Sequence, residues 1–479
     1  MAAKRSEKLL VIALDGLSLE QLRLLSSRLN WLGDMASAGT ALVLDTTPLV
    51  SAQAIWSEIL TGRAWFESGC SGYARPADSL DQLKILTCKD LNVSGSLVRH
   101  ENPPSTVCIN LPLISHSEEL VWLSDGSLPG DVAVAPGHLR SREPFASYRP
   151  RPYATSIQAL ADIDGSVRKC IDIERQRLLC ALELVRHHPW RTFFLRLSVF
   201  DSLAHLIGDE FLQEELSVSD VLWKFLEECF SLLSALVSSA DSAHICLIST
   251  YSHTRCAGRL NINRVLESEG LCKLMDGLAP DPPLQRRLAT LGRLDLLESP
   301  TSARPPLADL IVSKVSLAGS PTYGAIYLNT SNRFMDGIVA PPRADDIAKT
   351  VFSALKTSIV KRLQLDLDIW SSHVVCPPAQ RPPDYVMHYR WHTGKMHMAA
   401  SRPYAGPDRR TLHPAVPDFM IHVPGVELSD SGPSLFDPNS HPCSTHHPRG
   451  FALFLGKDVL TDGAIRPTQL NAMLESSLA

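Results

Sequence analysis

The sequence contains no run of eighteen apolar residues, so it predicts no transmembrane helix. It also lacks a small-residue cleavage site after its first apolar run, Lys8 to Leu14, which therefore predicts a first strand and not a signal peptide. Charge is nearly balanced, with 46 Lys and Arg residues against 51 Asp and Glu residues and a net charge of −5. This charge gives no attraction for a nucleic-acid polymer or an anionic membrane, so neither is expected as a partner.

The eleven cysteines are odd in number and include no CxxC pair, which argues against a disulfide framework. Three of them, Cys180, Cys229 and Cys246, lie inside apolar runs, where a cysteine behaves as a small buried hydrophobic residue. This usage is typical of a protein whose thiols stay reduced. The sequence therefore predicts a cytoplasmic location.

Length and composition predict a large α/β core. The chain has 479 residues, of which 44% are hydrophobic and 20% charged, so it can bury a sizeable core. Apolar runs of strand length alternate with amphipathic helical segments, which indicates a mostly parallel sheet covered by helices. From residue 278 to 413, proline-rich connectors surround a few elements, and we expect a smaller cap subdomain there. Residues 1–277 and 414–479 would then form the catalytic core.

Polar side chains of the kind used in catalysis follow several of the predicted strands. Asp201 and His205 end the segment that begins with the apolar run Phe193 to Phe200, and they are four positions apart. If a helix starts there, both lie on one side of its first turn and could form a metal-ligand pair. The alternative is a strand-end Asp that caps a helix beside an incidental His. Asp15 follows the first strand, at the edge where open α/β sheets hold their active sites.

Three further candidates lie near later elements. Ser51 precedes a predicted helix over Ala52 to Leu60, where a hydroxyl is an N-cap by default. The same place suits a nucleophile or a phosphate, because the helix N-terminus stabilises an anion. His253 follows the predicted strand His244 to Ser249, and His446 precedes the last strand. One such candidate would be weak evidence of a site, but candidates beside five predicted strands in succession form a pattern.

The order and spacing of these motifs resemble the type I phosphodiesterase/nucleotide pyrophosphatase family of the alkaline phosphatase superfamily. The resembling segments are LLVIALDG, TTPLVSAQAIWSEILTGR, FDSLAHLIG, ICLISTYSHTRC and STHHPRGFALFLG, and they are spread over nearly all of the chain. The resemblance implies a three-layer αβα sandwich and a metal-dependent hydrolase of phosphodiester, pyrophosphate or related phosphoric esters. It also implies a small-molecule substrate, a hydroxyl nucleophile and two divalent metal ions, commonly zinc.

The resemblance further implies where each metal ion would be held. Asp201, His205 and His446 would hold the first ion and leave an open fourth position, as in catalytic zinc sites. Asp15 and His253 would hold the second, together with a further Asp and the nucleophile oxygen. A hydroxyl bound to a metal ion becomes nucleophilic at neutral pH.

Two departures from the family pattern weaken the second of these sites. The family's Ser-Asp-His-Gly segment is replaced by STYSH (249–253), where Thr250 or Ser252 stands for the Asp, and a neutral hydroxyl is a poor carboxylate substitute. The family spacing places the nucleophile at Ala52, one residue after Ser51, so either Ser51 is the nucleophile or the nucleophile has been lost. The alternatives are a pseudoenzyme of the same fold with a binding role, and a transferase or a phosphonate- or sulfate-ester hydrolase on the same scaffold.

Overall fold

The computed structural model describes most of the predicted core and part of the cap. The described residues are 8–46, 49, 51–72, 74–76, 83–85, 97, 106–112, 120–125, 133–150, 162–208, 211–212, 219–241, 243–275, 307–308, 315–320, 323–371, 386–392, 395–401, 417–429, 436–438, 444–455 and 463–478.

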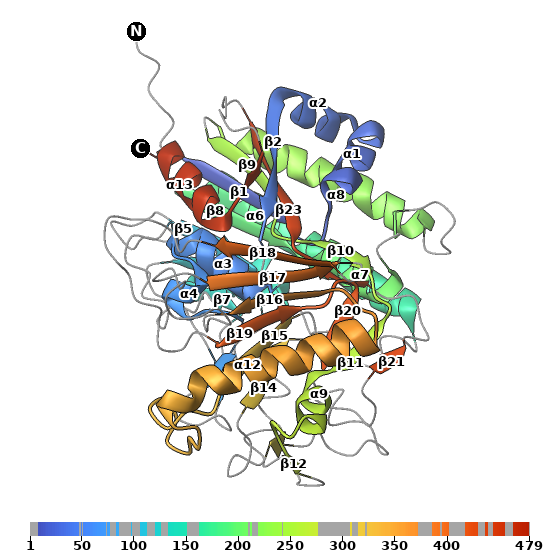
Figure 1. Cartoon of the computed structure of the whole chain (residues 1–479). Coiled ribbons are helices and arrows are strands. Elements are labelled where there is room, and N and C mark those ends of the chain that lie inside the picture. Colours follow the sequence, from blue (N-terminus) through green and yellow to red (C-terminus); the bar gives the residue numbers. More distant parts are fainter. Residues whose placement is uncertain are drawn as a thin grey trace.

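A nine-stranded sheet forms the core of the upper part of the molecule as drawn in Figure 1. Its strand order is β24-β2-β23-β9-β1-β8-β5-β6-β7, and β1 is parallel to both of its neighbours, as β5 is to β8 and β6. Strand β23 runs antiparallel to β2 and β9, so the sheet is mostly but not wholly parallel, as predicted. The strands are β1 (Leu9–Leu14), β2 (Gly39–Asp45), β5 (Thr106–Ile109), β6 (Val121–Leu123), β7 (Val134–Ala135), β8 (Thr192–Leu197), β9 (His244–Ser249), β23 (Arg449–Leu455) and β24 (Ala464–Ile465).

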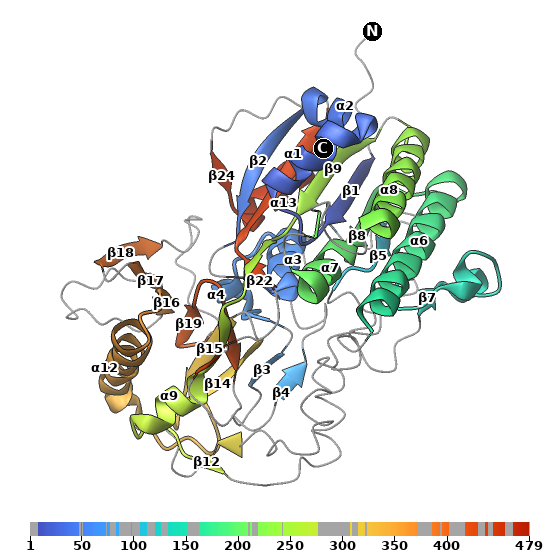
Figure 2. The same ribbon diagram turned by 90° about the vertical axis from the view of Figure 1, so that its right-hand side faces the viewer.

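Helices cover both faces of this sheet, which gives the three-layer αβα sandwich (Figure 2). In β1, Leu10 and Ile12 pack with α1, α2, α6 and α8, whereas Val11 and Ala13 face the opposite layer with α3 and α13. A strand covered on both faces needs an apolar residue at every position, which is why the first strand is a continuous apolar run. The helices of the two layers and the sheet edge are α1 (Leu19–Arg28), α2 (Asn30–Ala38), α3 (Ala52–Thr61), α4 (Trp65–Ser68), α6 (Ile163–His187), α7 (Val199–Ile207), α8 (Ser219–Ser239) and α13 (Pro467–Leu478).

The amphipathic pattern over residues 19–36 predicts a single helix, but the structure has two helices there. They meet at Leu29, whose backbone is extended with φ −112° and ψ 99°, so the chain turns between α1 and α2. Ser18 caps α1, because its hydroxyl accepts from the Gln21 N–H and the Gln21 side chain accepts from the Ser18 N–H. The amphipathic pattern predicted the helical character correctly but did not reveal the break.

A second, antiparallel sheet of six strands lies beside the first and packs against α12 (Figure 1). Its order is β14-β15-β19-β16-β17-β18. Strand β19 lies past the predicted cap boundary at residue 413, yet it pairs with β15 and β16 in the middle of this sheet. The sequence also favours a strand at 373–376, and these residues lie outside the described ranges. The elements of this part are β14 (Val315–Ser320), β15 (Tyr323–Leu328), α12 (Ala344–Leu355), a π-helical segment (Lys356–Arg362), β16 (Leu367–Ser371), β17 (Val386–His392), β18 (Lys395–Ser401) and β19 (Phe419–His422).

Short strands, one short helix and 3-10 turns make up the rest of the described elements. Strand β10 pairs with β22, β11 pairs with both β20 and β21, β12 pairs with β13, and β3 pairs with β4. These elements are β3 (Ala74–Pro76), β4 (Leu83–Ile85), β10 (Ser252–Arg255), β11 (Gly258–Asn261), α9 (Ile262–Ser268), β12 (Leu274–Met275), β13 (Leu307–Ala308), β20 (Val426–Ser429), β21 (Phe436–Pro438), β22 (Ser444–His447) and the 3-10 turns Gly137–Leu139, Phe145–Ser147 and Pro341–Arg343.

Across the described ranges, no helix has both the length and the apolar character needed to cross a lipid bilayer. The eight cysteines in these ranges are all buried.

Candidate metal centre

The carboxyl ends of three adjacent strands meet where β1, β8 and β9 lie side by side. Asp15 follows β1, Asp201 lies in the first turn of α7 after β8, and Tyr251 follows β9. Two backbone hydrogen bonds join these ends: the Asp201 N–H donates to the Asp15 carbonyl at 3.1 Å, and the Gly16 N–H donates to the Tyr251 carbonyl at 3.2 Å. Gly16 permits this approach, because its φ is +99° and a Cβ there would lie 2.5 Å from the Asp201 nitrogen.

Three histidines surround Asp201. His205 lies one helical turn further along α7, on the same side as Asp201, as their spacing predicted. His253 is on β10 and His446 on β22, and these antiparallel strands place the two histidines directly opposite each other. The structure thus gathers one carboxylate and three imidazoles from a helix and two strands that are far apart in the sequence.

The donor atoms of these four side chains converge on one point. Asp201 Oδ1 lies 3.1 Å from His253 Nε2, 3.0 Å from His446 Nε2 and 3.5 Å from His205 Nε2. His205 Nε2 and His446 Nε2 are 3.1 Å apart, and all four donor atoms lie within 4.8 Å of one another. Bonds of 2.0–2.1 Å to a tetrahedral zinc ion would separate the ligand atoms by about 3.3 Å. The residues present therefore fit one ion of this kind.

A serine behind the cluster sets the orientation of two imidazoles. The Ser444 carbonyl lies 3.1 Å from His205 Nδ1, so that nitrogen carries the proton and donates it. The Ser444 hydroxyl donates to the Ala204 carbonyl at 2.7 Å, so it accepts from His253 Nδ1 at 2.9 Å. In both rings Nε2 is then the unprotonated nitrogen, and it lies among the other donor atoms of the cluster, which is the tautomer a metal ligand needs.

The charge states of two members match those of metal ligands. Burial opposes ionisation of Asp201, but its close contacts with His253 and His446 outweigh burial and hold the pKa of the carboxyl well below its usual value. Burial lowers the pKa of His253 to about 3, against the opposing effect of Asp201. Asp201 is therefore an anion and His253 a neutral imidazole near neutral pH, and metal binding requires these two forms.

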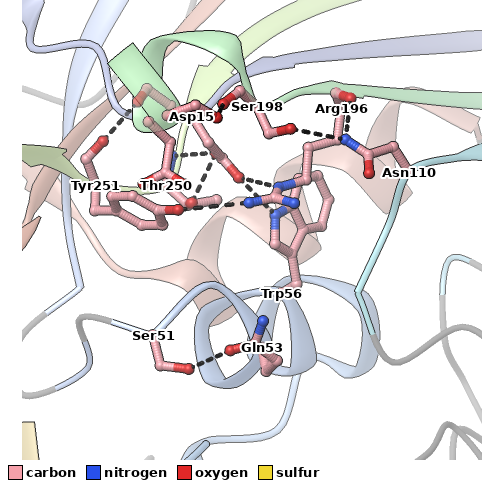
Figure 3. Close-up of polar contacts among 12 residues, drawn as sticks. Asp15, Ser51, Gln53, Trp56, Asn110, Arg196, Ser198, Thr250 and Tyr251 are labelled. Carbon is pink, nitrogen blue, oxygen red and sulfur yellow. Dashed lines mark hydrogen bonds and ion pairs between the residues drawn. The ribbon is translucent and has the colours of Figure 1, made fainter. Parts of the chain in front are cut away.

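Asp15 is not part of this cluster, and its carboxylate is engaged by protein donors (Figure 3). Its Oδ1 accepts from the Thr250 N–H at 3.0 Å and from the Thr250 hydroxyl at 2.7 Å. Its Oδ2 accepts from Trp56 Nε1 at 3.2 Å and forms an ion pair with Arg196 Nε. The Arg196 side chain is 7% exposed and Asp15 fully buried. Burial opposes charge on Arg196, but the Asp15 carboxylate outweighs it and holds the pKa of the guanidinium well above its usual value.

Tyr251 lies between this ion pair and the cluster. Its hydroxyl accepts from Arg196 Nη2 at 3.4 Å (Figure 3). Its ring stacks on the His446 ring, with the centroids 4.1 Å apart and the planes 22° from parallel. Tyr251 therefore contacts both the Arg196 guanidinium and the ring of His446.

No protein-family model matches the chain, and no curated protein matches it. Solved structures do match. Phosphonoacetate hydrolase from Sinorhizobium meliloti 1021 in complex with phosphonoformate gives a TM-score of 0.56 at 10% identity, over 99% of this chain and 96% of that chain. Murine ectonucleotide pyrophosphatase/phosphodiesterase 5 in complex with AMP gives 0.50 at 12% identity, over 98% of this chain and 94% of that chain. This chain has an alkaline phosphatase-like fold. At such low identity the likeness establishes the fold.

In this alkaline phosphatase-like fold, the structure groups the predicted site residues differently from the sequence. Asp201, His205 and His446 lie together, as the resemblance implied for the first ion. His253 joins them, whereas the resemblance paired it with Asp15. The residues around Asp15 do not fit the second ion that the resemblance implies, because protein donors already surround both carboxylate oxygens.

Ser51, the predicted nucleophile, is the N-cap residue of α3 but makes no capping hydrogen bond with its side chain. Its hydroxyl instead donates to Gln53 Oε1 at 2.7 Å, and the residue is 3% exposed (Figure 3). Ser51 therefore has the N-cap position that the alternative predicted, but its side chain does not make the capping hydrogen bond. Ala52, where the family spacing falls, is the first residue of α3 and offers no hydroxyl.

Sequence reasoning missed Arg196, Tyr251 and Ser444. Arg196 carries a recognisable signal, because it is the one charged residue in the buried strand TFFLRL, and a buried charge has to be paired. Tyr251 and Ser444 carry no comparable signal, since their roles depend on the stacking of one ring and the pairing of two short strands.

Proposed function

We propose that this chain is a metal-dependent hydrolase of small phosphoric esters, phosphodiesters above all. The observation that carries the proposal is the convergence of Asp201, His205, His253 and His446 at the carboxyl edge of the sheet of an alkaline phosphatase-like fold. A divalent ion bound there supplies a Lewis acid for a phosphoryl oxygen. The solved structures that share the fold add support, since two of them hold AMP or phosphonoformate.

The side chains of the cluster suggest the direction from which a substrate approaches. The His205 side chain is 25% exposed, whereas that of His253 is fully buried beneath it. A phosphoryl group would therefore reach the cluster from the His205 side. His253 and the Ser444 hydroxyl behind it would hold the geometry from the protein interior.

Ser51 remains the proposed nucleophile. Its hydroxyl hydrogen is directed to Gln53, so a lone pair on Oγ remains available for attack on phosphorus. Attack would form a bond from Ser51 Oγ to phosphorus, release the alcohol of the ester, and leave a covalent intermediate that water hydrolyses. If Ser51→Ala keeps the turnover of the wild type, this assignment is wrong.

The test combines metal content with turnover. Wild-type protein purified without chelator should contain tightly bound zinc by plasma mass spectrometry and should hydrolyse bis-p-nitrophenyl phosphate. Asp201→Asn and His205→Ala should lose both properties. Their matched controls are Asp172→Asn, whose side chain is 70% exposed on α6, and His187→Ala, whose side chain is 64% exposed on the same helix. Both controls should keep both properties. A wild-type protein with no bound metal and no turnover would sink the proposal.

The second candidate is a pseudoenzyme with a binding role, and the cluster itself favours it. Four protein ligands fill a tetrahedral coordination sphere, which is the arrangement of a structural site, whereas catalytic sites keep one position open. Tightly bound zinc without turnover of phosphomonoesters, phosphodiesters, phosphonate esters or sulfate esters would establish this candidate. Turnover of the phosphonate or sulfate ester alone would instead identify a different hydrolase on the same scaffold.

The location proposed is a reducing compartment, which agrees with the burial of all eight described cysteines. Thiol titration of the freshly isolated, denatured protein should give a count close to the eleven cysteines of the sequence.

A further inference from the structure

We infer that this chain binds a single divalent metal ion, on Asp201, His205, His253 and His446, and that the Arg196 guanidinium takes the place of a second ion beside Asp15. The inference rests on the proposed function in one respect: it requires the metal centre. It differs from what the family resemblance implies, which is two ions, one of them on Asp15 and His253.

Protein donors fill the acceptor sites of the Asp15 carboxylate. An ionised carboxylate offers about four lone-pair sites. The backbone N–H and the hydroxyl of Thr250 donate to Oδ1, and Trp56 Nε1 and Arg196 Nε donate to Oδ2 (Figure 3). Thr250 and Trp56 are fully buried, so water does not compete for these positions. A metal ion at Asp15 would have to displace at least one of these buried protein donors.

The positive charge of Arg196 also opposes a second metal ion beside Asp15. The single negative charge of Asp15 is already balanced by the positive charge of Arg196 within hydrogen-bonding distance. An arginine, unlike a lysine, does not lose its proton in proteins, so the guanidinium cannot become neutral to admit a dication. A second metal ion would be buried next to a permanent like charge.

The other residues expected to bind a second ion, His253 and Thr250, have different partners in the structure. His253 directs Nε2 at Asp201 and donates from Nδ1 to Ser444, which commits both of its nitrogens to the first cluster. Thr250, which stands where the family has an Asp, uses its hydroxyl as a donor to Asp15. Tyr251 fills the space between Arg196 and His446 with its ring.

The test counts metal ions in the full-length chain. Protein stripped with chelator, dialysed and titrated with zinc should bind one ion per chain at the tight site by native mass spectrometry. His253→Ala should weaken zinc binding by about 10- to 100-fold or more, because loss of a residue that only supports a ligand already has an effect of that size. Asp15→Asn should still bind one ion, with a dissociation constant within about threefold of the wild type, because Asp15 is not one of the four ligands. His187→Ala is the matched control for the histidine variant.

Each outcome bears on one claim. Two tight ions per wild-type chain, or loss of an ion in Asp15→Asn, would overturn the inference and leave the proposed hydrolase intact. No tight ion in the wild type would overturn the metal centre and with it the proposed function. An unchanged affinity in His253→Ala would show that His253 is not a ligand and would also refute the inference. Because the wild-type count decides between one and two ions without any variant, the test does not depend on the folding of Asp15→Asn.

Discussion

Replacing Arg196 by methionine tests whether the ion pair with Asp15 is a stabilising part of the core. Arg196→Met keeps a long side chain in β8 but removes the positive charge, so a fully buried carboxylate loses its counter-ion. Loss of one partner of a buried pair costs about 3–5 kcal/mol in the free energy of unfolding. Asp15 keeps its donors from Thr250 and Trp56, which places the expected loss near the lower end, at about 3 kcal/mol.

The measurement is urea unfolding followed by tryptophan fluorescence at pH 7. Arg142→Met is the matched control, because Arg142 pairs with Glu183 at 3.5 Å with 57% of its side chain exposed, and such pairs contribute below about 1 kcal/mol. In the double variant Arg196→Met with Asp15→Asn, no buried charge is left unpaired. Its loss should therefore be smaller than the sum of the single losses by roughly 1–3 kcal/mol. Equal losses for Arg196→Met and Arg142→Met, or strict additivity in the double variant, would refute the reasoning.

Three further predictions concern the backbone, pH and substrate charge. Gly16→Ala should destabilise the fold more than Gly208→Ala in the same urea assay: both glycines have positive φ, but a Cβ at Gly16 would meet Asp201 backbone atoms and one at Gly208 meets nothing within 4 Å. Equal losses would contradict the close contact. Burial raises the pKa of Glu58 to about 7, above the value near 4.5 in the unfolded chain, so its folded form binds more protons and stability falls as pH rises from about 4.5 to 7. Glu58→Gln should flatten the fall in melting temperature across that window, and an unchanged slope would show that Glu58 does not cause it. One dication with Asp201 carries a net charge of +1, because Arg196 and Asp15 cancel, so the site suits a monoanionic diester better than a nearly dianionic monoester. The value of kcat/KM for methyl p-nitrophenyl phosphate should exceed that for p-nitrophenyl phosphate by about tenfold, and the reverse preference would count against a site with one ion.

The central strands β1 and β8 were predictable because they are buried at every position. The strand predicted at His244 to Ser249 has these bounds in the structure, and the predicted run Lys8 to Leu14 differs from β1 by one residue. Such runs leave little choice of conformation once helices flank them. The cap boundary was less predictable, because β19 is short and its place between β15 and β16 depends on pairing with distant strands.

The part of the candidate site formed by residues close in the sequence was predictable. The part that depends on the pairing of distant strands was not. Asp201 and His205 share one turn of α7, so their proximity follows from helical periodicity. The position of His253 depends on the register of β10 against β22, which only the folded chain sets. A motif comparison assigns such a residue by its neighbours in sequence, and here those neighbours, Thr250 and Tyr251, face Asp15 and His446 instead.

The pairing of β10 with β22 has a consequence for how the protein acquires its metal. Asp201 and His446 are 245 positions apart, so an ion held by both acts as a clip that closes a very long loop. During synthesis, the Asp201 half of the site would leave the ribosome long before His446 exists, and the complete set of ligands would form only once β22 has been made and has docked. Metal loading would then be a late, post-synthetic event. Limited proteolysis should detect it as protection of the segment around β22 that appears only when the ion is added.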